Sequence, residues 1–173
     1  MTSLLARFIR AVEALMTVVR SLIAVILVIS VLLNFANVAG RKFLAHPIIG
    51  AEEVMNFLMV AVVFLGAGVV AYDGTHINME ILIDRFPPPL RNAFRALAQI
   101  GAIAIAAVLV TLGIPIVKHL AGFDERSQAA NVPLWIPQLM VPVGLTLLAL
   151  GALARLAMLA VPREAANPPE IQA

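Results

Sequence analysis

The sequence predicts an all-α integral membrane protein, and three observations support this fold class. Apolar residues make up 62% of the chain and charged residues only 13%, whereas soluble domains carry about 25% charged residues. Four long runs contain no charged residue: Ser21–Gly40, Val54–Tyr72, Ala96–Val117 and Ser127–Ala154. Each run reaches the roughly 17–25 residues of a transmembrane helix, and none has the polar face that a helix of a soluble bundle needs.

We therefore expect a single membrane domain over residues 1–161. Its four transmembrane helices are predicted at about 21–39, 54–72, 97–117 and 136–160. The last helix is expected to begin near Ile136, because prolines precede and follow this position. Residues 162–173 hold three prolines and no apolar run, and they are expected to form a disordered cytoplasmic tail.

Residues 2–20, ahead of the first span, have helical periodicity. Apolar side chains recur at spacings of three and four, and Arg7, Arg10 and Arg20 fall on the other side. This pattern predicts an N-terminal amphipathic helix that lies at the inner membrane surface or enters the first span at an angle. A cleaved signal peptide is the alternative, but its charged region would be long and three more spans follow.

The outer end of the first span is polar on one side. Asn34, Asn37 and Arg41 share a helical face there, and Lys42 follows. One interpretation is a polar seam toward a partner helix, since amides hydrogen-bond across helices in lipid. The other is the ordinary interfacial end of a span.

The second span opens with two adjacent carboxylates, Glu52 and Glu53. A helix N-terminus favours negative charge by a few tenths to about 1 kcal/mol, which accounts for them without any function. Alternatively they contact another subunit at the outer interface. Past the end of this span, Asp73 and His76 are expected in the inner loop.

Small residues mark faces on which three of the spans can pack closely. Such residues let helix backbones approach each other in lipid. We assign this role to Gly66, Gly68, Ala71, Gly101, Gly144 and Gly151.

The distribution of basic residues predicts the orientation. With the N-terminus inside, eight of the twelve basic residues fall on the inner side: Arg7, Arg10, Arg20, Arg85, Arg91, Arg95, Arg155 and Arg163. The outer side receives the other four: Arg41, Lys42, Lys118 and Arg126. The positive-inside rule therefore places both termini in the cytoplasm.

The sequence argues against chemistry within the membrane. Pumps and ion carriers place an ionisable residue at membrane depth, and the predicted spans contain no charged residue away from their ends. There is no cysteine, and the three histidines supply no pair at one depth for haem. We therefore expect no cofactor, no metal and no enzymatic activity, and the net charge of +2 suggests no nucleic-acid partner.

Several short motifs, in their order and spacing, resemble the small membrane subunit of tripartite ATP-independent periplasmic (TRAP) transporters. They are Ala51-Glu52-Glu53, Val63-Phe64-Leu65-Gly66-Ala67, His76-Ile77, Ser127, Val132-Pro133-Leu134-Trp135-Ile136-Pro137 and Val141-Pro142-Val143-Gly144. The likeness covers about residues 10–160. Many relatives have an aromatic residue just before the Ala-Glu-Glu group, where this chain has Gly50.

The resemblance implies an accessory subunit of a sodium-driven transporter for organic acids in the bacterial inner membrane. It implies two protein partners, a large membrane subunit that carries the substrate and ion sites and a periplasmic substrate-binding protein, besides membrane lipids. The small subunit would brace the large one. The alternatives are a membrane anchor of a redox complex or a homo-oligomeric channel or carrier, whose pore candidates are Asn34, Asn37, Gln99 and Thr111.

Overall fold

The computed structural model describes residues 2–43, 48–74 and 88–160. These residues form four helices: α1 (Thr2–Phe43), α2 (Ala51–Asp73), α4 (Pro88–Gly122) and α5 (Trp135–Ala160). Within the described part of the chain, all four are long and apolar enough to cross a membrane. The prediction of an all-α protein with four long apolar helices is confirmed. His76 and the tail at 162–173 lie outside the described residues.

Glycines in the left-handed conformation bound α2 at both ends. Gly50 precedes the helix at φ 80°, and Gly74 follows it at φ 69°. The backbone N–H of Gly74 donates a hydrogen bond to the carbonyl of Val70, which satisfies one of the last free carbonyls of the helix. The helix therefore begins three residues before the predicted span and ends one residue after it.

The other helices extend beyond their predicted spans as well. α4 begins at Pro88, where proline suits the first turn because its missing N–H has no partner there in any case. It runs 35 residues to Gly122 and contains Pro115. α5 begins at Trp135, one residue before the predicted start.

The N-terminal segment and the first span form one continuous helix. α1 has 42 residues, which gives a length of about 63 Å at 1.5 Å per residue. This is about twice the thickness of a ~30 Å hydrocarbon core. The N-terminal segment therefore continues into the first predicted span without a break near Arg20.

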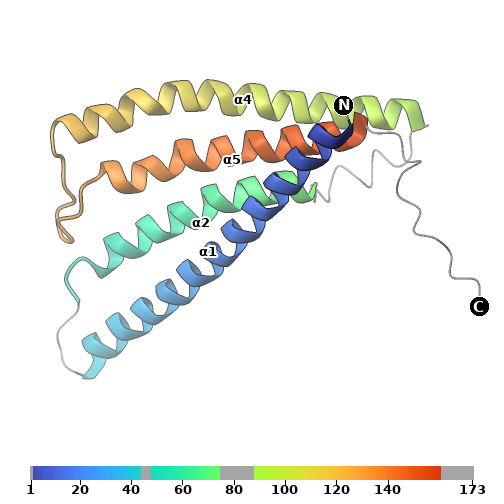
Figure 1. The fold of residues 1–173 in the computed structure, drawn as a ribbon. Helices are drawn as coiled ribbons and strands as arrows, with labels where there is room; N and C mark the ends of the chain where they lie inside the picture. Colours follow the sequence, from blue (N-terminus) through green and yellow to red (C-terminus); the bar gives the residue numbers. More distant parts are fainter. Residues whose placement is uncertain (1, 44–47, 75–87, 161–173) are drawn as a thin grey trace, which may run out of the picture.

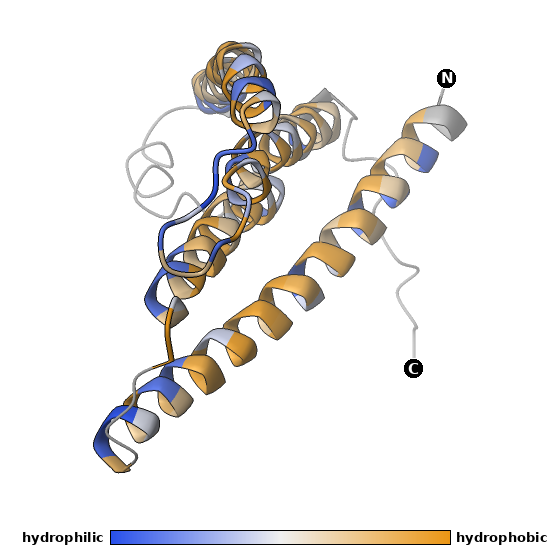
Figure 2. Cartoon of the chain, turned by 90° about the vertical axis from the view of Figure 1, so that its left-hand side faces the viewer, coloured by the Kyte–Doolittle hydropathy of each residue, from blue (hydrophilic) through white to orange (hydrophobic). Residues whose placement is uncertain are grey.

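The helices form an open row rather than a closed bundle. In the described structure α5 packs against both α2 and α4, while α1 packs mainly on α2 and to a smaller extent on α5. Figure 1 shows this order, with α4 at one edge and α1 crossing obliquely at the other. Figure 2 shows α1 set at an angle to the other three helices, with apolar colour along most of its length.

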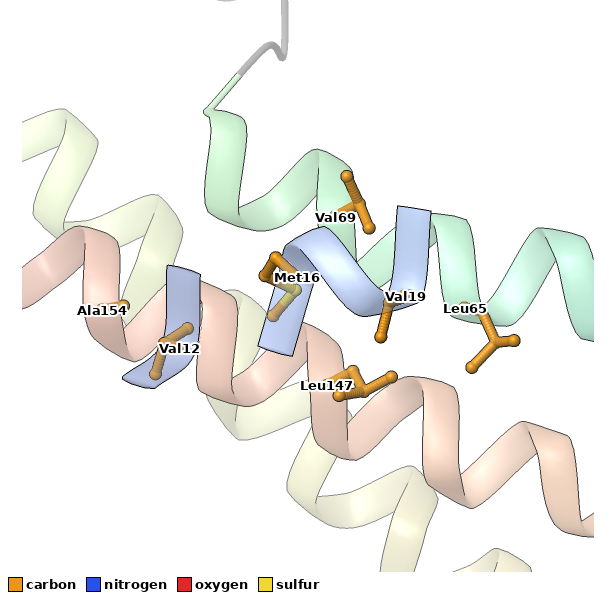
Figure 3. Packing of buried hydrophobic residues seen from close by; sticks show 7 residues of the cluster. All are labelled: Val12, Met16, Val19, Leu65, Val69, Leu147 and Ala154. Carbon is orange, nitrogen blue, oxygen red and sulfur yellow. The ribbon is translucent and has the colours of Figure 1, made fainter. Parts of the chain in front are cut away.

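The buried core lies where α1 crosses α2 and α5. Val12, Met16 and Val19 of α1 recur at spacings of four and three and are almost fully buried. They pack with Leu65 and Val69 of α2 and with residues of α5 (Figure 3). The α5 members of this cluster are Leu147 and Ala154. Val12, Met16 and Val19, part of the apolar face of the N-terminal segment, are thus covered by protein.

Candidate functional site

At the outer end of the row, Glu53 connects α2 to the loop between α4 and α5. We call this end, at which α2 begins, outer because of the orientation expected from the basic residues. The Glu53 carboxylate oxygen Oε2 accepts hydrogen bonds from the backbone N–H groups of Ala129 at 3.1 Å and Ala130 at 2.8 Å. These residues belong to the loop between α4 and α5, so one carboxylate ties the loop to the first turn of α2.

The loop is held by its own backbone as well. Ser127 donates its N–H to the carbonyl of Val132 at 2.9 Å, and the N–H of Val132 donates to the Ser127 hydroxyl at 3.2 Å. Gly50 presses against the same loop, because a Cβ at Gly50 would lie 2.6 Å from Cα of Ala130. Any larger residue would push the loop away from α2, quite apart from the strain of its positive φ.

Glu52 has a different environment from its neighbour. It is exposed, and the described residues include no hydrogen-bond or ion-pair partner for it. Arg41 and Lys42, in the last turn of α1, are also exposed at this end. In the loop, Arg126 pairs with Asp124 at 3.2 Å, and both side chains are largely exposed. The outer surface therefore carries charges of both signs.

The two asparagines predicted as one seam are separated by the structure. Asn34 is exposed, whereas Asn37 is only 5% exposed. The Asn37 side-chain oxygen accepts the backbone N–H of Ile48 at 3.1 Å and so ties the chain ahead of α2 to α1. Asn37 thus has a partner inside this chain.

The inner end is joined by charged side chains. Asp73, the last residue of α2, forms an ion pair with Arg20 of α1. Arg155 of α5 lies over the next residue, since a Cβ at Gly74 would lie 2.7 Å from its guanidinium group. Side chains from three helices therefore meet where α2 ends.

The small residues predicted for helix packing fall into two groups. Gly68, Gly144 and Gly151 lie in the contact between α2 and α5: a Cβ at Gly144 would overlap the carbonyl of Phe64, and one at Gly151 would lie 2.8 Å from that of Gly68. Ala71 is buried. By contrast, a Cβ at Gly66 or Gly101 would meet nothing within 4 Å.

The pore candidates do not converge. Asn34 and Asn37 belong to α1, and Gln99 and Thr111 belong to α4, at opposite edges of the row. Thr111 donates its hydroxyl to the carbonyl of Val108 in its own helix at 2.7 Å. Within one copy of the described chain, these four side chains line no common path.

A family model for the DctQ component of tripartite ATP-independent periplasmic transporters matches residues 30–161. This match covers most of the chain, including the loop that Glu53 holds. The chain belongs to the DctQ family. It is thus a small membrane subunit of the TRAP type, and the resemblance noted from its motifs is confirmed.

Curated relatives of this DctQ-family chain are named as TRAP permease proteins. It is 29% identical over 132 residues to the ectoine TRAP transporter small permease protein TeaB of Halomonas elongata, covering 74% of this chain and 68% of the relative. It is 27% identical to the C4-dicarboxylate small permease protein DctQ of Rhodobacter capsulatus, covering 58% of this chain and 44% of the relative.

A third relative is named as a DctMQ permease. The chain is 25% identical over 113 residues to the isethionate TRAP transporter permease protein DctMQ of Oleidesulfovibrio alaskensis. This match covers 65% of the chain and only 18% of the relative. The DctQ-family chain thus matches a small part of a much longer permease.

The contact of Glu53 with the loop was missed by reasoning from the sequence. The sequence alone predicts a helix-dipole residue or a contact to another subunit at Glu53. The donors are the backbone N–H groups of Ala129 and Ala130, which every residue except proline has, so the sequence carries no signal for the pairing. The two residues are also 76 positions apart in the sequence.

Proposed function

We propose that this chain braces the large membrane subunit of a sodium-driven TRAP transporter for organic acids in a bacterial inner membrane. In this role it enlarges the part of the transporter that stays fixed in the bilayer and does not itself carry substrate or sodium. The permease names of the relatives support the assignment, and the DctMQ relative supports close association with the large subunit.

The observation that carries this proposal is the location of the charged side chains. In the described parts of α2, α4 and α5, they all lie within about two turns of a helix end. In α1, Arg10, Glu13 and Arg20 lie further from the helix ends, but all three precede the charge-free run Ser21–Gly40. Arg20 also pairs with Asp73 at the inner end of α2. An ion or proton path would need a charged group at membrane depth. A brace needs apolar faces instead.

Such faces are present on both edges of the row. Val31 and Phe35 of α1 are 66% and 73% exposed, and Leu97, Ile105 and Leu112 of α4 are all more than 60% exposed. In a membrane these side chains contact lipid or another membrane protein. We assign part of this surface to the large subunit.

Co-purification tests the proposal. The chain, tagged at its C-terminus, is isolated from its native membrane in mild detergent, and the eluted proteins are identified and quantified. We expect a much larger membrane protein in stoichiometric amount. Elution of this chain alone as a stable homo-oligomer, with transport activity in liposomes, would instead support a channel or carrier and would refute the proposed role.

We assign the outer surface to contact with a periplasmic binding protein. Arg41, Lys42 and Glu52 are exposed there and have no role in holding the loop. Reversing Arg41 and Lys42 to glutamate should weaken capture of the binding protein by the purified complex and leave assembly with the large subunit intact. Unchanged capture would remove these two residues from the contact.

In our proposal, other components of the transporter, and not this chain, determine which compound is transported. The names of the three relatives contain three different compounds: ectoine, C4-dicarboxylate and isethionate. Exchange of this chain for a relative, with the other components kept, should leave the substrate preference of uptake unchanged. A changed preference would mean that the small subunit takes part in selection.

A further inference from the structure

A groove opens between α2 and α4. It has a volume of about 510 Å³, with six residues of α2, Gln99 and Ala102 of α4, and Leu148 of α5 along its walls. The α2 side is apolar and formed by Val62, Val63, Gly66, Ala67, Val70 and Ala71. The missing side chain at Gly66 contributes to the open space, since a Cβ there would meet nothing within 4 Å.

One face of α4 leads from this groove to the inner end of the row. Arg91, Arg95, Gln99 and Ala102 are spaced by four, four and three residues, so they lie one above another on the same side of the helix. Gln99 and Ala102 line the groove. Both arginines are half-buried. They therefore lie one and two turns below the groove, at the end of α4 expected to face the cytoplasm.

We propose that the groove and these arginines form a binding site for one anionic phospholipid. An acyl chain fills the apolar groove, the phosphate and its acidic headgroup bind the guanidinium groups of Arg91 and Arg95, and the Gln99 amide donates a hydrogen bond to the glycerol ester. Basic pockets between transmembrane helices on the cytoplasmic side bind such headgroups. Arginine suits a phosphate because its N–H groups form paired, charge-assisted hydrogen bonds.

The apolar lining of the groove and the neighbouring arginines favour an acyl chain with an anionic headgroup over a helix of another protein. The groove follows α2 from Val62 to Ala71, which is about 15 Å of helix. At one end of this apolar stretch lie two arginines of α4, which suits a molecule with an apolar chain and an anionic group. A single hydrocarbon chain is narrow enough to enter.

Native mass spectrometry of the full chain tests the proposal. The purified chain is stripped of lipid and then titrated with phosphatidylglycerol or with phosphatidylcholine of the same acyl chains. We expect one phosphatidylglycerol to bind in preference to phosphatidylcholine. The double variant Arg91→Gln/Arg95→Gln should lose about thirtyfold in affinity for phosphatidylglycerol, because two basic contacts to an anionic lipid are removed.

Two matched controls distinguish the contribution of the arginines from that of the groove to lipid binding. Arg7→Gln/Arg10→Gln removes the same charge from exposed positions of α1 and should leave binding unchanged. Gly66→Leu fills the groove and should abolish binding of both lipids, whereas Gly101→Leu, also placed in open space but outside the groove, should retain it.

Three results would overturn the site. The first is equal binding of the two lipids by the unaltered chain. The second is unchanged phosphatidylglycerol binding after loss of Arg91 and Arg95. The third is a Gly66→Leu chain that keeps its lipid but no longer co-purifies with the large subunit, which would assign the groove to a protein partner.

Discussion

Two adjacent glutamates at the start of α2 have different roles. Glu53 accepts two backbone N–H groups from the loop between α4 and α5, while Glu52 is exposed. Hydrogen bonds to a charged acceptor are roughly twice as strong as those between neutral groups. Glu53 thus fixes the outer loop, and Glu52 remains available to a partner.

Glu53→Gln should lower the thermal stability of the outer end, because an amide oxygen replaces the charged acceptor. Glu53→Ala should lower it further, because the N–H groups of Ala129 and Ala130 lose their partner. The measurement is thermal unfolding in detergent followed by fluorescence of Trp135, the single tryptophan, which lies at the junction of loop and α5. Glu52→Gln is the matched control, and an equal effect from it would disprove the assignment.

The glycines also have different environments. Gly144 lies in close helix contact, whereas Gly101 borders open space. Gly144→Ala places a methyl group against the carbonyl of Phe64 and should destabilise the contact of α2 with α5 by about 1–3 kcal/mol, as overpacking does. Gly101→Ala meets nothing within 4 Å and should be neutral or slightly stabilising. Unfolding of both variants in mixed micelles compares them, and similar stabilities would contradict the close approach.

At the scale of the element, the inner half of α1 packs on the core, whereas most of its outer half is exposed although Asn37 is buried. Met16 is fully buried against α2 and α5, whereas Val31 and Phe35 further along are mostly exposed. The fixed part of α1 is therefore its crossing over the core, close to the ion pair of Arg20 with Asp73.

Met16→Ala should loosen this crossing. Truncating a buried methionine leaves a cavity and costs about 2–5 kcal/mol in water-soluble proteins. We expect the lower part of that range here, because lipid offers the released surface an apolar environment. Met59→Ala is the control, since Met59 is 65% exposed. Protease resistance of α1 in nanodiscs reports the difference, and equal digestion of the two variants would argue against the packed crossing.

The helices could be predicted from the sequence, and their arrangement could not. Charge-free runs such as Val54–Tyr72 mark apolar helices directly, because charges are costly in a membrane. The periodicity of residues 2–20 reveals the apolar face that contains Val12, Met16 and Val19. Because lipid and a protein interior are both apolar, the pattern does not show which of the two covers this face.

For the candidate sites, the sequence identified residues but not their partners. The small-residue rule selected Gly66 together with Gly144, although only Gly144 lies in close helix contact. Asn37 and Glu53 were recognised as polar residues at span ends. Their partners, Ile48 and Ala130, are backbone N–H groups, which leave no mark in side-chain chemistry.

At the scale of the whole molecule, the open row fits a subunit that is completed by a partner. Within the described residues each helix is covered on some sides only, and α4 and α1 lie at opposite edges. Both edges must therefore contact lipid or another protein. The same geometry predicts that the isolated chain folds but is less stable than it is in the proposed complex with a large subunit.

The absence of cysteine allows a direct test of orientation. Single cysteines at Ser3 and at Gln128 should react differently with a membrane-impermeant maleimide in intact spheroplasts. We expect labelling of Gln128→Cys in the outer loop and protection of Ser3→Cys until the membrane is opened. The reverse pattern would overturn the assignment of the inner and outer ends.

Because α1 is long, its tilt should depend on the thickness of the bilayer. α2 has 23 residues, or about 35 Å, which is close to the thickness of a hydrocarbon core, whereas α1 is about 63 Å long. A helix that exceeds the local thickness tilts, and a thicker bilayer reduces the tilt that it needs. Because its inner half is anchored on α2 and α5, a change of thickness displaces mainly its outer half. We therefore expect lipid composition to set how far α1 extends sideways from the row.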